Sequence, residues 1–234
     1  MRPNRVACLT TVRRVWRCLV IALVAFVLLS SLAVILYGAI VPPVTPLMVI
    51  RWVEGDRASR QWAPYRRISP ELVVAVMASE DARFCRHFGI DWQAAREAWH
   101  KNQRSSQLYG ASTITMQTAR NLFLWPSRSW LRKGVEVYFT VLLELFLDKR
   151  RIMELYLNVI EWGRGIYGAE TAARAYFGKS AAELTRREAA LLAAVLPDPR
   201  RWSPAAPTAY IVRRAAIIQG RMRVMDEDAA RLCR

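Results

Sequence analysis

A run of 23 apolar residues, Leu19 to Val41, constrains this chain more than any other feature of its sequence. As a helix the run would be about 34 Å long, against a membrane hydrocarbon core of about 30 Å. A soluble helix is rarely apolar on every face over this length, and a cleavable signal peptide has a shorter apolar core before a small-residue cleavage site. Pro42 and Pro43 follow the run instead. We therefore expect an uncleaved transmembrane helix over residues 19–41.

The charges beside this run predict its orientation. Arg13, Arg14 and Arg17 directly precede it, whereas Arg51 is a single charge on the far side. Basic residues are retained on the cytoplasmic side of a membrane. We therefore expect residues 1–18 to form a cytoplasmic tail and everything after Val41 to face the periplasm or cell exterior.

The excess of positive charge persists beyond the membrane segment. The chain has 35 Lys and Arg against 19 Asp and Glu, a net charge of +16. Five of the arginines and none of the acids lie in residues 1–41, which leaves 30 against 19, or +11, for the rest. Such a charge favours an anionic partner: nucleic acid, lipid headgroups or a phosphorylated substrate. The expected location outside the cytoplasm argues against nucleic acid.

The cysteines and histidines do not indicate a zinc site. The four cysteines match neither a zinc pattern nor a disulfide framework, and the two histidines form no HExxH motif. Cys85 and Cys233 could pair only if the fold brings them together.

The rest of the chain divides into a linker and one domain. Residues 42–68 are rich in proline, arginine and aromatics, and they read either as a juxtamembrane linker or as a loop packed on the domain. Residues 69–234 show helical periodicity with little strand alternation, and we expect a polar tail after about Arg223. Ser69-Pro70-Glu71 is a helix start. Further helices are expected over 114–124, 131–147, 152–160 and 188–196.

Four short motifs in this domain carry polar residues in suggestive positions: EDARFCRHFGID from Glu80, GASTITMQ from Gly110, RKGVE from Arg132 and KRRIMELYLN from Lys149. Glu80 continues the apolar face marked by Val76 and Met77, where desolvation would favour a proton acceptor. The second motif opens a helix whose free N–H groups suit an anion. Taken singly, the four motifs also fit, in order, an ordinary helix end, a solvated helix, a surface ion pair and the apolar stripe of a core helix.

In this order, the four motifs resemble the biosynthetic peptidoglycan glycosyltransferases, glycosyltransferase family 51. The signatures of that family read approximately EDxxFxxHxGxD, GxSTITQQ, RKxxE and KxxIxxxYLN, and a later run, REAALLAAVLP from Arg187, is also similar. The match covers about residues 69–204. Met116 departs from it, because it stands where the family has the first glutamine of its pair, and a thioether donates no hydrogen bond.

The resemblance implies a mainly α, lysozyme-like helical glycosyltransferase domain behind one transmembrane helix. The implied reaction joins a lipid-linked glycan strand to the 4-hydroxyl of another lipid II molecule, with inversion and release of polyprenyl pyrophosphate. No SxxK, KTG or KSG motif occurs, and about 30 residues follow Pro204. We therefore expect a monofunctional polymerase without transpeptidase activity.

The resemblance also implies roles for individual residues. Glu80 would be the base, and Glu136 the second carboxylate, near the pyrophosphate, where a Mg²⁺ or Mn²⁺ cofactor could offset its charge. The residues expected to clamp phosphate oxygens are Arg120, Arg128, Arg132 and Lys133. The residues expected to shape the cleft are Asp81, Phe84, His87, Ser112 and Gln117.

The expected partners are lipid II, the growing glycan strand, the inner membrane and proteins of wall synthesis or division, with no nucleic acid. The sequence alone leaves two alternative functions open. A lysozyme-like lytic enzyme would also use a glutamate, but as an acid. A non-enzymatic, basic membrane-anchored scaffold would explain charge and anchor, but not the ordered motifs.

Overall fold

The structure, a computed structural model, describes residues 5–104, 110–127 and 129–232. It divides into an N-terminal unit, residues 1–40, and a C-terminal unit, residues 41–234.

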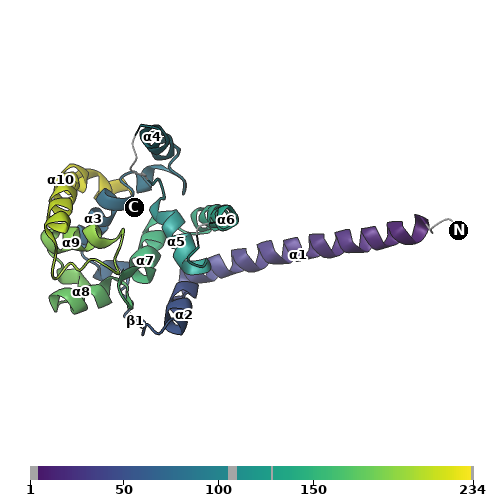
Figure 1. Cartoon of the computed structure of the whole chain (residues 1–234), viewed down its shortest axis with the longest axis horizontal. Coiled ribbons are helices and arrows are strands. Elements are labelled where there is room, and N and C mark those ends of the chain that lie inside the picture. Colours follow the sequence, from purple (N-terminus) through teal and green to yellow (C-terminus); the bar gives the residue numbers. More distant parts are fainter. Residues whose placement is uncertain (1–4, 105–109, 128, 233–234) are drawn as a thin grey trace. The chain divides into compact units, whose positions relative to one another are not determined.

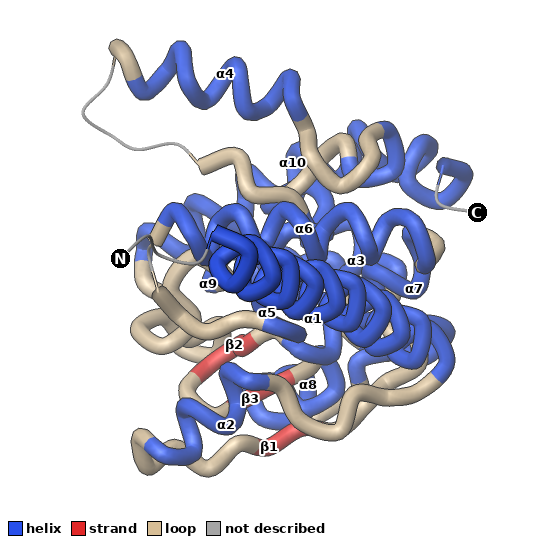
Figure 2. The backbone as a smooth tube through the Cα atoms, turned by 90° about the vertical axis from the view of Figure 1, so that its right-hand side faces the viewer, coloured by secondary structure: helices blue, strands red, loops and turns tan. Residues whose placement is uncertain are grey.

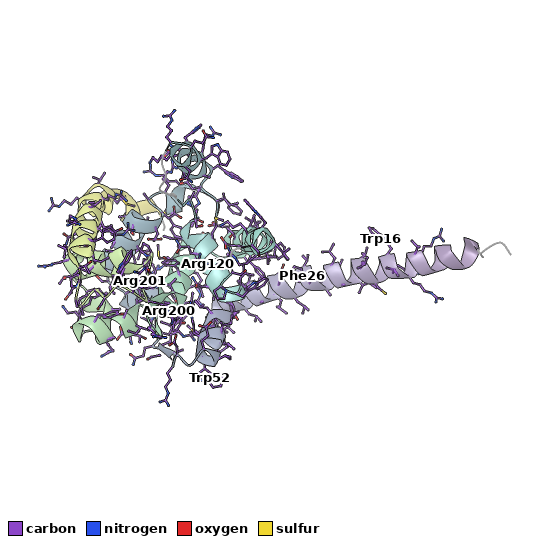
Figure 3. The ribbon with its side chains drawn as sticks, in the orientation of Figure 1. Trp16, Phe26, Trp52, Arg120, Arg200 and Arg201 are labelled. Carbon is purple, nitrogen blue, oxygen red and sulfur yellow. The ribbon has the colours of Figure 1, made fainter. Side chains whose placement is uncertain are left out.

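The N-terminal unit is a single helix, α1 (Arg5–Ala39). Its segment Val12–Ala39 has a mean hydropathy of 3.1 and, by length and composition, could cross a membrane. Large apolar side chains, Trp16 and Phe26 among them, project from the helix instead of packing into a core (Figure 3). The helix expected from the apolar run is confirmed, and it ends before Pro42 and Pro43, because proline cannot donate the next helical hydrogen bonds.

The segment expected as a linker has regular structure of its own. It contains α2 (Pro46–Val53), β1 (Ser59–Arg60) and the short 3₁₀ helix η1 (Tyr65–Arg67). Thr45 caps α2 by accepting a hydrogen bond from the Met48 amide. Trp62 packs on the domain and donates its Nε1–H to Glu154 at 3.3 Å, whereas Trp52 is exposed and points outward (Figure 3). Part of this segment is therefore packed on the domain, and its role as a juxtamembrane linker stays a prediction.

Helices dominate the C-terminal unit (Figures 1 and 2). One group packs α3 (Pro70–Glu80) and α9 (Arg186–Val195) against α10 (Ala209–Leu232). A second group packs α5 (Ile114–Phe123) against α6 (Trp130–Phe146) and α7 (Lys149–Val159). The remaining helices are α4 (Trp92–Asn102), α8 (Ala169–Phe177), η2 (Phe84–Arg86) and η3 (Ala181–Glu183). The predicted mainly α class is confirmed.

A small three-stranded sheet interrupts the helices (Figure 2). Its strands are β1, β2 (Glu161–Gly163) and β3 (Ile166–Tyr167), in the order β1-β3-β2. β1 pairs parallel with β3, and β2 pairs antiparallel with it. Gly165, between β2 and β3, has φ of +72°, and a Cβ there would lie 2.5 Å from the Arg57 carbonyl oxygen. A larger residue would therefore break this turn.

The expected helices at 114–124, 131–147, 152–160 and 188–196 correspond to α5, α6, α7 and α9. Ser69 caps α3 as predicted, by accepting a hydrogen bond from Glu71. The polar tail expected after Arg223 was wrong, because α10 continues to Leu232. Cys85 is disulfide-bonded, and Cys233, with which it could pair, lies outside the described residues.

Asn158 lies on α7 and connects this helix to the segment that precedes α3. It is fully buried, its Oδ1 accepts from the Ala63 amide at 2.8 Å, and its Nδ2 donates to the Ala63 carbonyl at 2.9 Å. An Asn158→Ala change would leave two buried backbone groups without partners, at about 1–3 kcal/mol each.

We therefore expect Asn158→Ala to lower the free energy of unfolding by about 3 kcal/mol. Urea denaturation of the detergent-solubilised chain measures it, with Gln93→Ala on an exposed face of α4 as the control. A loss as small as that of the control would contradict the account of Asn158.

Candidate active site

Glu80 ends α3 and lines a cavity of about 370 Å³, here called the Glu80 cavity. Its Oε1 accepts a hydrogen bond from the Ser79 hydroxyl at 3.0 Å, and its Oε2 accepts one from Gln117 Nε2 at 3.0 Å. Among the residues that the structure describes, Glu80 has no ion-pair partner. Both hydrogen-bonded neighbours are neutral, so the carboxylate is oriented without being neutralised and can accept a proton.

Gln117 is itself held by Tyr156. The Tyr156 hydroxyl donates to Gln117 Oε1 at 3.3 Å, which leaves the amide nitrogen to donate to Glu80. Burial raises the pKa of Tyr156 well above its usual range, and the negative charge of Glu80 acts in the same direction. The phenol therefore stays protonated and fixes the orientation of the amide.

Asp81 joins the end of α3 to the start of α5. Its Oδ2 accepts from the Ile114 amide at 3.0 Å, and its Oδ1 lies 2.9 Å from His87 Nε2. One of the N–H groups at the start of α5 is therefore taken by Asp81 and is not free for an anion. Thr113 caps α5 through the Met116 amide, as expected for this helix start.

Asp91 lies close enough to Asp81 and His87 for the three to share a cation. However, Asp91 accepts two hydrogen bonds of 2.8 Å from Arg83. Burial acts to raise the pKa of Asp91, but hydrogen bonds from the Ala94 amide and Arg83 outweigh it and lower that pKa. The two aspartates are therefore engaged by His87 and Arg83, and both line the Glu80 cavity, whereas His87 Nδ1 is buried without a hydrogen-bond partner among the described residues.

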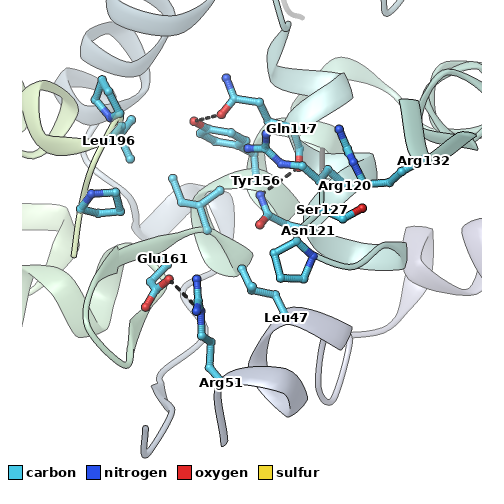
Figure 4. Close-up of a pocket in the computed structure, with 14 residues that line it drawn as sticks. Leu47, Arg51, Gln117, Arg120, Asn121, Ser127, Arg132, Tyr156, Glu161 and Leu196 are labelled. Atoms are coloured by element: carbon cyan, nitrogen blue, oxygen red, sulfur yellow. Dashed lines mark hydrogen bonds and ion pairs between the residues drawn. The ribbon is translucent and has the colours of Figure 1, made fainter. Parts of the chain in front are cut away.

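A second cavity, of about 620 Å³, adjoins Gln117 and is here called the arginine cavity (Figure 4). Arg120 and Arg132 line it from α5 and α6, and Arg51 lines it from α2. Among the described residues, the guanidinium of Arg120 has no hydrogen-bond or ion-pair partner. A guanidinium that lines a cavity without a counter-charge is suited to bind an anion.

The third motif builds a buried charge cluster beside this cavity. Glu136 is 1% exposed, and its Oε2 accepts from Arg132 Nη1. Its Oε1 accepts from Lys133 Nζ at 2.5 Å, and that nitrogen also lies 3.4 Å from Ser112 Oγ, which lines the Glu80 cavity. The pair that periodicity suggested to be a surface ion pair is therefore buried.

Three buried polar atoms around the arginine cavity have no hydrogen-bond partner among the described residues: Arg51 Nε, Arg132 Nε and Ser127 Oγ. Buried donors without partners are rare in folded proteins, and each costs free energy. The three atoms belong to residues that line one cavity, whose polar groups are therefore not all paired within the described protein.

The structure thus brings together most of the residues singled out in the sequence. Phe84 is fully buried, with Lys149 Nζ 4.6 Å from its ring centroid, and it lines neither cavity. His87 supports Asp81 from behind the Glu80 cavity. Arg128 lies outside the described residues. Met116 is 5% exposed and lines neither cavity, so the missing glutamine changes the packing of α5 and not a cavity wall.

Four polar residues that line the arginine cavity were not predicted from the sequence: Arg51, Ser127, Tyr156 and Glu161. Tyr156 fitted a core stripe, Arg51 lies on α2 in the segment expected as a linker or loop, and Ser127 and Glu161 lie outside the helices. Only the fold, which brings α2, α7 and β2 to the same cavity, identifies them (Figure 4).

Comparison with known proteins agrees with this geometry. A family model described as transglycosylase matches residues 47–223. A biosynthetic peptidoglycan transglycosylase of Rhodospirillum centenum is 52% identical over 96% of this chain and 98% of its own length. Proteins of the same name from Caulobacter vibrioides and Pseudomonas putida are 52% and 48% identical, over 87% and 91% of this chain and 89% and 91% of their own lengths.

The buried cluster gives a stability prediction. Glu136→Gln would leave Arg132, which is 8% exposed, without its counter-charge, and we expect a loss of about 3 kcal/mol in the free energy of unfolding. Glu71→Gln, which breaks the more exposed pair with Arg186, should cost less than about 1 kcal/mol. Equal losses in urea denaturation would mean that the cluster does not stabilise the fold as described.

Proposed function

The chain belongs to the transglycosylase family, and from this premise we propose that it polymerises lipid II into linear glycan strands. The growing strand, bound through its polyprenyl pyrophosphate, is transferred to the 4-hydroxyl of a second lipid II molecule with inversion. One observation carries the proposal: Gln117 joins a carboxylate that has no ion pair among the described residues to a cavity lined by arginines.

Glu80 serves as the base on the attacking hydroxyl. Its two oxygens hold hydrogen bonds from Ser79 and Gln117, so its orientation is set before the substrate binds. The positive charge nearest in sequence, Arg83, is engaged by Asp91. The carboxylate therefore retains its capacity to take the proton as the new bond forms.

The leaving pyrophosphate is stabilised in the arginine cavity. Arg120 supplies an uncompensated charge, and Arg132 presents an Nε–H without a partner. These donors favour the negative charge that develops on the leaving group. Arg128, which lies outside the described residues, and Lys133 are further candidates for this role.

The cation expected at Glu136 does not fit this arrangement. Both carboxylate oxygens accept hydrogen bonds from positively charged side chains, Arg132 and Lys133, which already offset the charge of Glu136. A Mg²⁺ or Mn²⁺ ion prefers oxygen ligands that are not paired with cations. No step of the proposed reaction passes through a metal.

The substrate suits an enzyme held at a membrane. α1 is apolar enough to span a bilayer, and Arg13, Arg14 and Arg17 at its start favour an N-terminus in the cytoplasm. The domain would then work at the outer face of the inner membrane, in cell wall synthesis. The arginine cavity also has apolar walls, including Leu47, Leu196 and Pro197, which fit the first units of a polyprenyl chain.

The product of the reaction tests this proposal. We expect the full-length protein in detergent to convert lipid II into glycan strands on a gel, and Glu80→Gln to reduce the rate at least about 100-fold, the lower range for loss of a general base. Glu71→Gln, the same change on the same helix, should be close to the unaltered protein.

Two outcomes would contradict the proposal. Glu80→Gln activity within a few-fold of the control would remove Glu80 from the role of base. Release of soluble fragments from finished glycan, without polymerisation of lipid II, would indicate a lytic enzyme.

A further inference from the structure

Arg51 lines the arginine cavity from a different element than the other two arginines. It projects from α2, the helix that follows α1 in the chain, whereas Arg120 and Arg132 belong to α5 and α6 (Figure 4). Leu47, one turn earlier on α2, lines the same cavity. α2 therefore contributes both an apolar and a cationic group to it.

The other described arginines of the cavity do not fully balance the charge of a diphosphate. A diphosphate that links a sugar to a lipid carries two negative charges, and Arg132 is already matched by Glu136. Among the described residues that line the cavity, Arg120 is a cation without a counter-charge, and it balances one of the two charges. A further cation that faces the cavity would strengthen the binding of the diphosphate.

Arg51 has a donor to spare for a ligand. Its Nη1 forms an ion pair with Glu54 Oε2 at 2.6 Å, and because Glu54 is exposed this pair neutralises the guanidinium only weakly. Its Nε is buried and has no hydrogen-bond partner among the described residues. Glu161 Oε2 lies 4.0 Å from that nitrogen, too far for a hydrogen bond. The charge of Glu161 therefore attracts the guanidinium of Arg51, while the Nε–H group of Arg51 remains available to a ligand.

Glu161 explains how Arg51 is held at the cavity. Its Oε1 accepts from Arg200 at 3.2 Å and from the Gly165 amide at 3.3 Å, which turns Oε2 toward Arg51. Burial raises the pKa of Glu161. Arg200 already offsets part of the charge of this buried carboxylate at Oε1, and Oε2 is the oxygen that remains to attract Arg51.

Resting on the proposed function, we propose that Arg51 is a diphosphate-binding residue of this enzyme and that Glu161 is the residue that positions it. The site then draws on the helix that follows the membrane anchor as well as on the motif-bearing helices. A merely structural Arg51 would tie α2 to β2 and would leave ligand affinity unchanged.

Binding of farnesyl pyrophosphate to the full-length protein in detergent micelles tests the role of Arg51. By isothermal titration calorimetry we expect Arg51→Ala to weaken binding about 10-fold, which corresponds to 1.4 kcal/mol. Arg57→Ala is the matched control, since Arg57 is an exposed arginine of the same segment that does not line the cavity. Equal affinities in the two variants would overturn the role of Arg51.

Arg51→Lys separates binding from folding. It keeps the charge but loses the Nε–H group, so we expect a thermal midpoint near that of the unaltered protein and affinity about 3-fold weaker. Affinity equal to that of the unaltered protein would show that the Nε–H group makes no contact with the diphosphate.

Glu161→Gln tests the positioning role through the sign of its effect. Removing a negative charge beside the cavity should by itself tighten the binding of an anion. If Glu161 holds Arg51, the change instead weakens binding, about 3-fold, and the weakening disappears in the Arg51→Ala background. Tighter binding in the single variant would overturn the role of Glu161.

The polymerisation and binding assays together distinguish a failure of this inference from a failure of the proposed function. Polymerisation of lipid II by the unaltered protein, with no binding of farnesyl pyrophosphate, would overturn the inference alone. Binding that depends on Arg51, without polymerisation, would overturn the proposed function and leave Arg51 as a diphosphate ligand.

Discussion

The hydrogen bond from Gln117 to Glu80 is the contact on which the rest of the site depends. It fixes the carboxylate at the end of α3 against a residue of α5, and the Tyr156 hydroxyl on α7 fixes the amide in turn. Three helices from different parts of the chain therefore determine one orientation. Because Gln117 also lines the arginine cavity, the same contact holds Glu80, the proposed base, beside the proposed site of the leaving group.

The cations beside the arginine cavity differ in how far neighbouring carboxylates neutralise them. Glu136 is buried between Arg132 and Lys133, a cluster that would be unstable if either side were removed. Arg120 has no such counter-charge among the described residues. An enzyme that stabilises a developing anion needs cations that are fixed in place before the reaction and are not fully neutralised. The buried cluster supplies the fixed scaffold, and Arg120 supplies the free charge.

The sequence predicted local features better than spatial ones. The apolar run, the cap at Ser69 and the periodic stretches of α5, α6, α7 and α9 depend on neighbours within a few residues, and the structure has them. α4, α8 and α10 were not predicted, although the apolar residues of α4 and α8 recur at helical spacing. The burial of Glu136 and the convergence of Arg51, Tyr156 and Glu161 on one cavity depend on contacts between distant segments, which no single-sequence pattern contains.

The central claim is that the base and the leaving diphosphate occupy separate cavities joined at Gln117. An experimental structure of the full-length protein with a bound polyprenyl pyrophosphate tests it most directly. We expect diphosphate oxygens within hydrogen-bond distance of Arg120 and Arg132, with the Glu80 cavity open to the second substrate. A diphosphate bound in the Glu80 cavity, with Arg120 in contact with solvent alone, would contradict it.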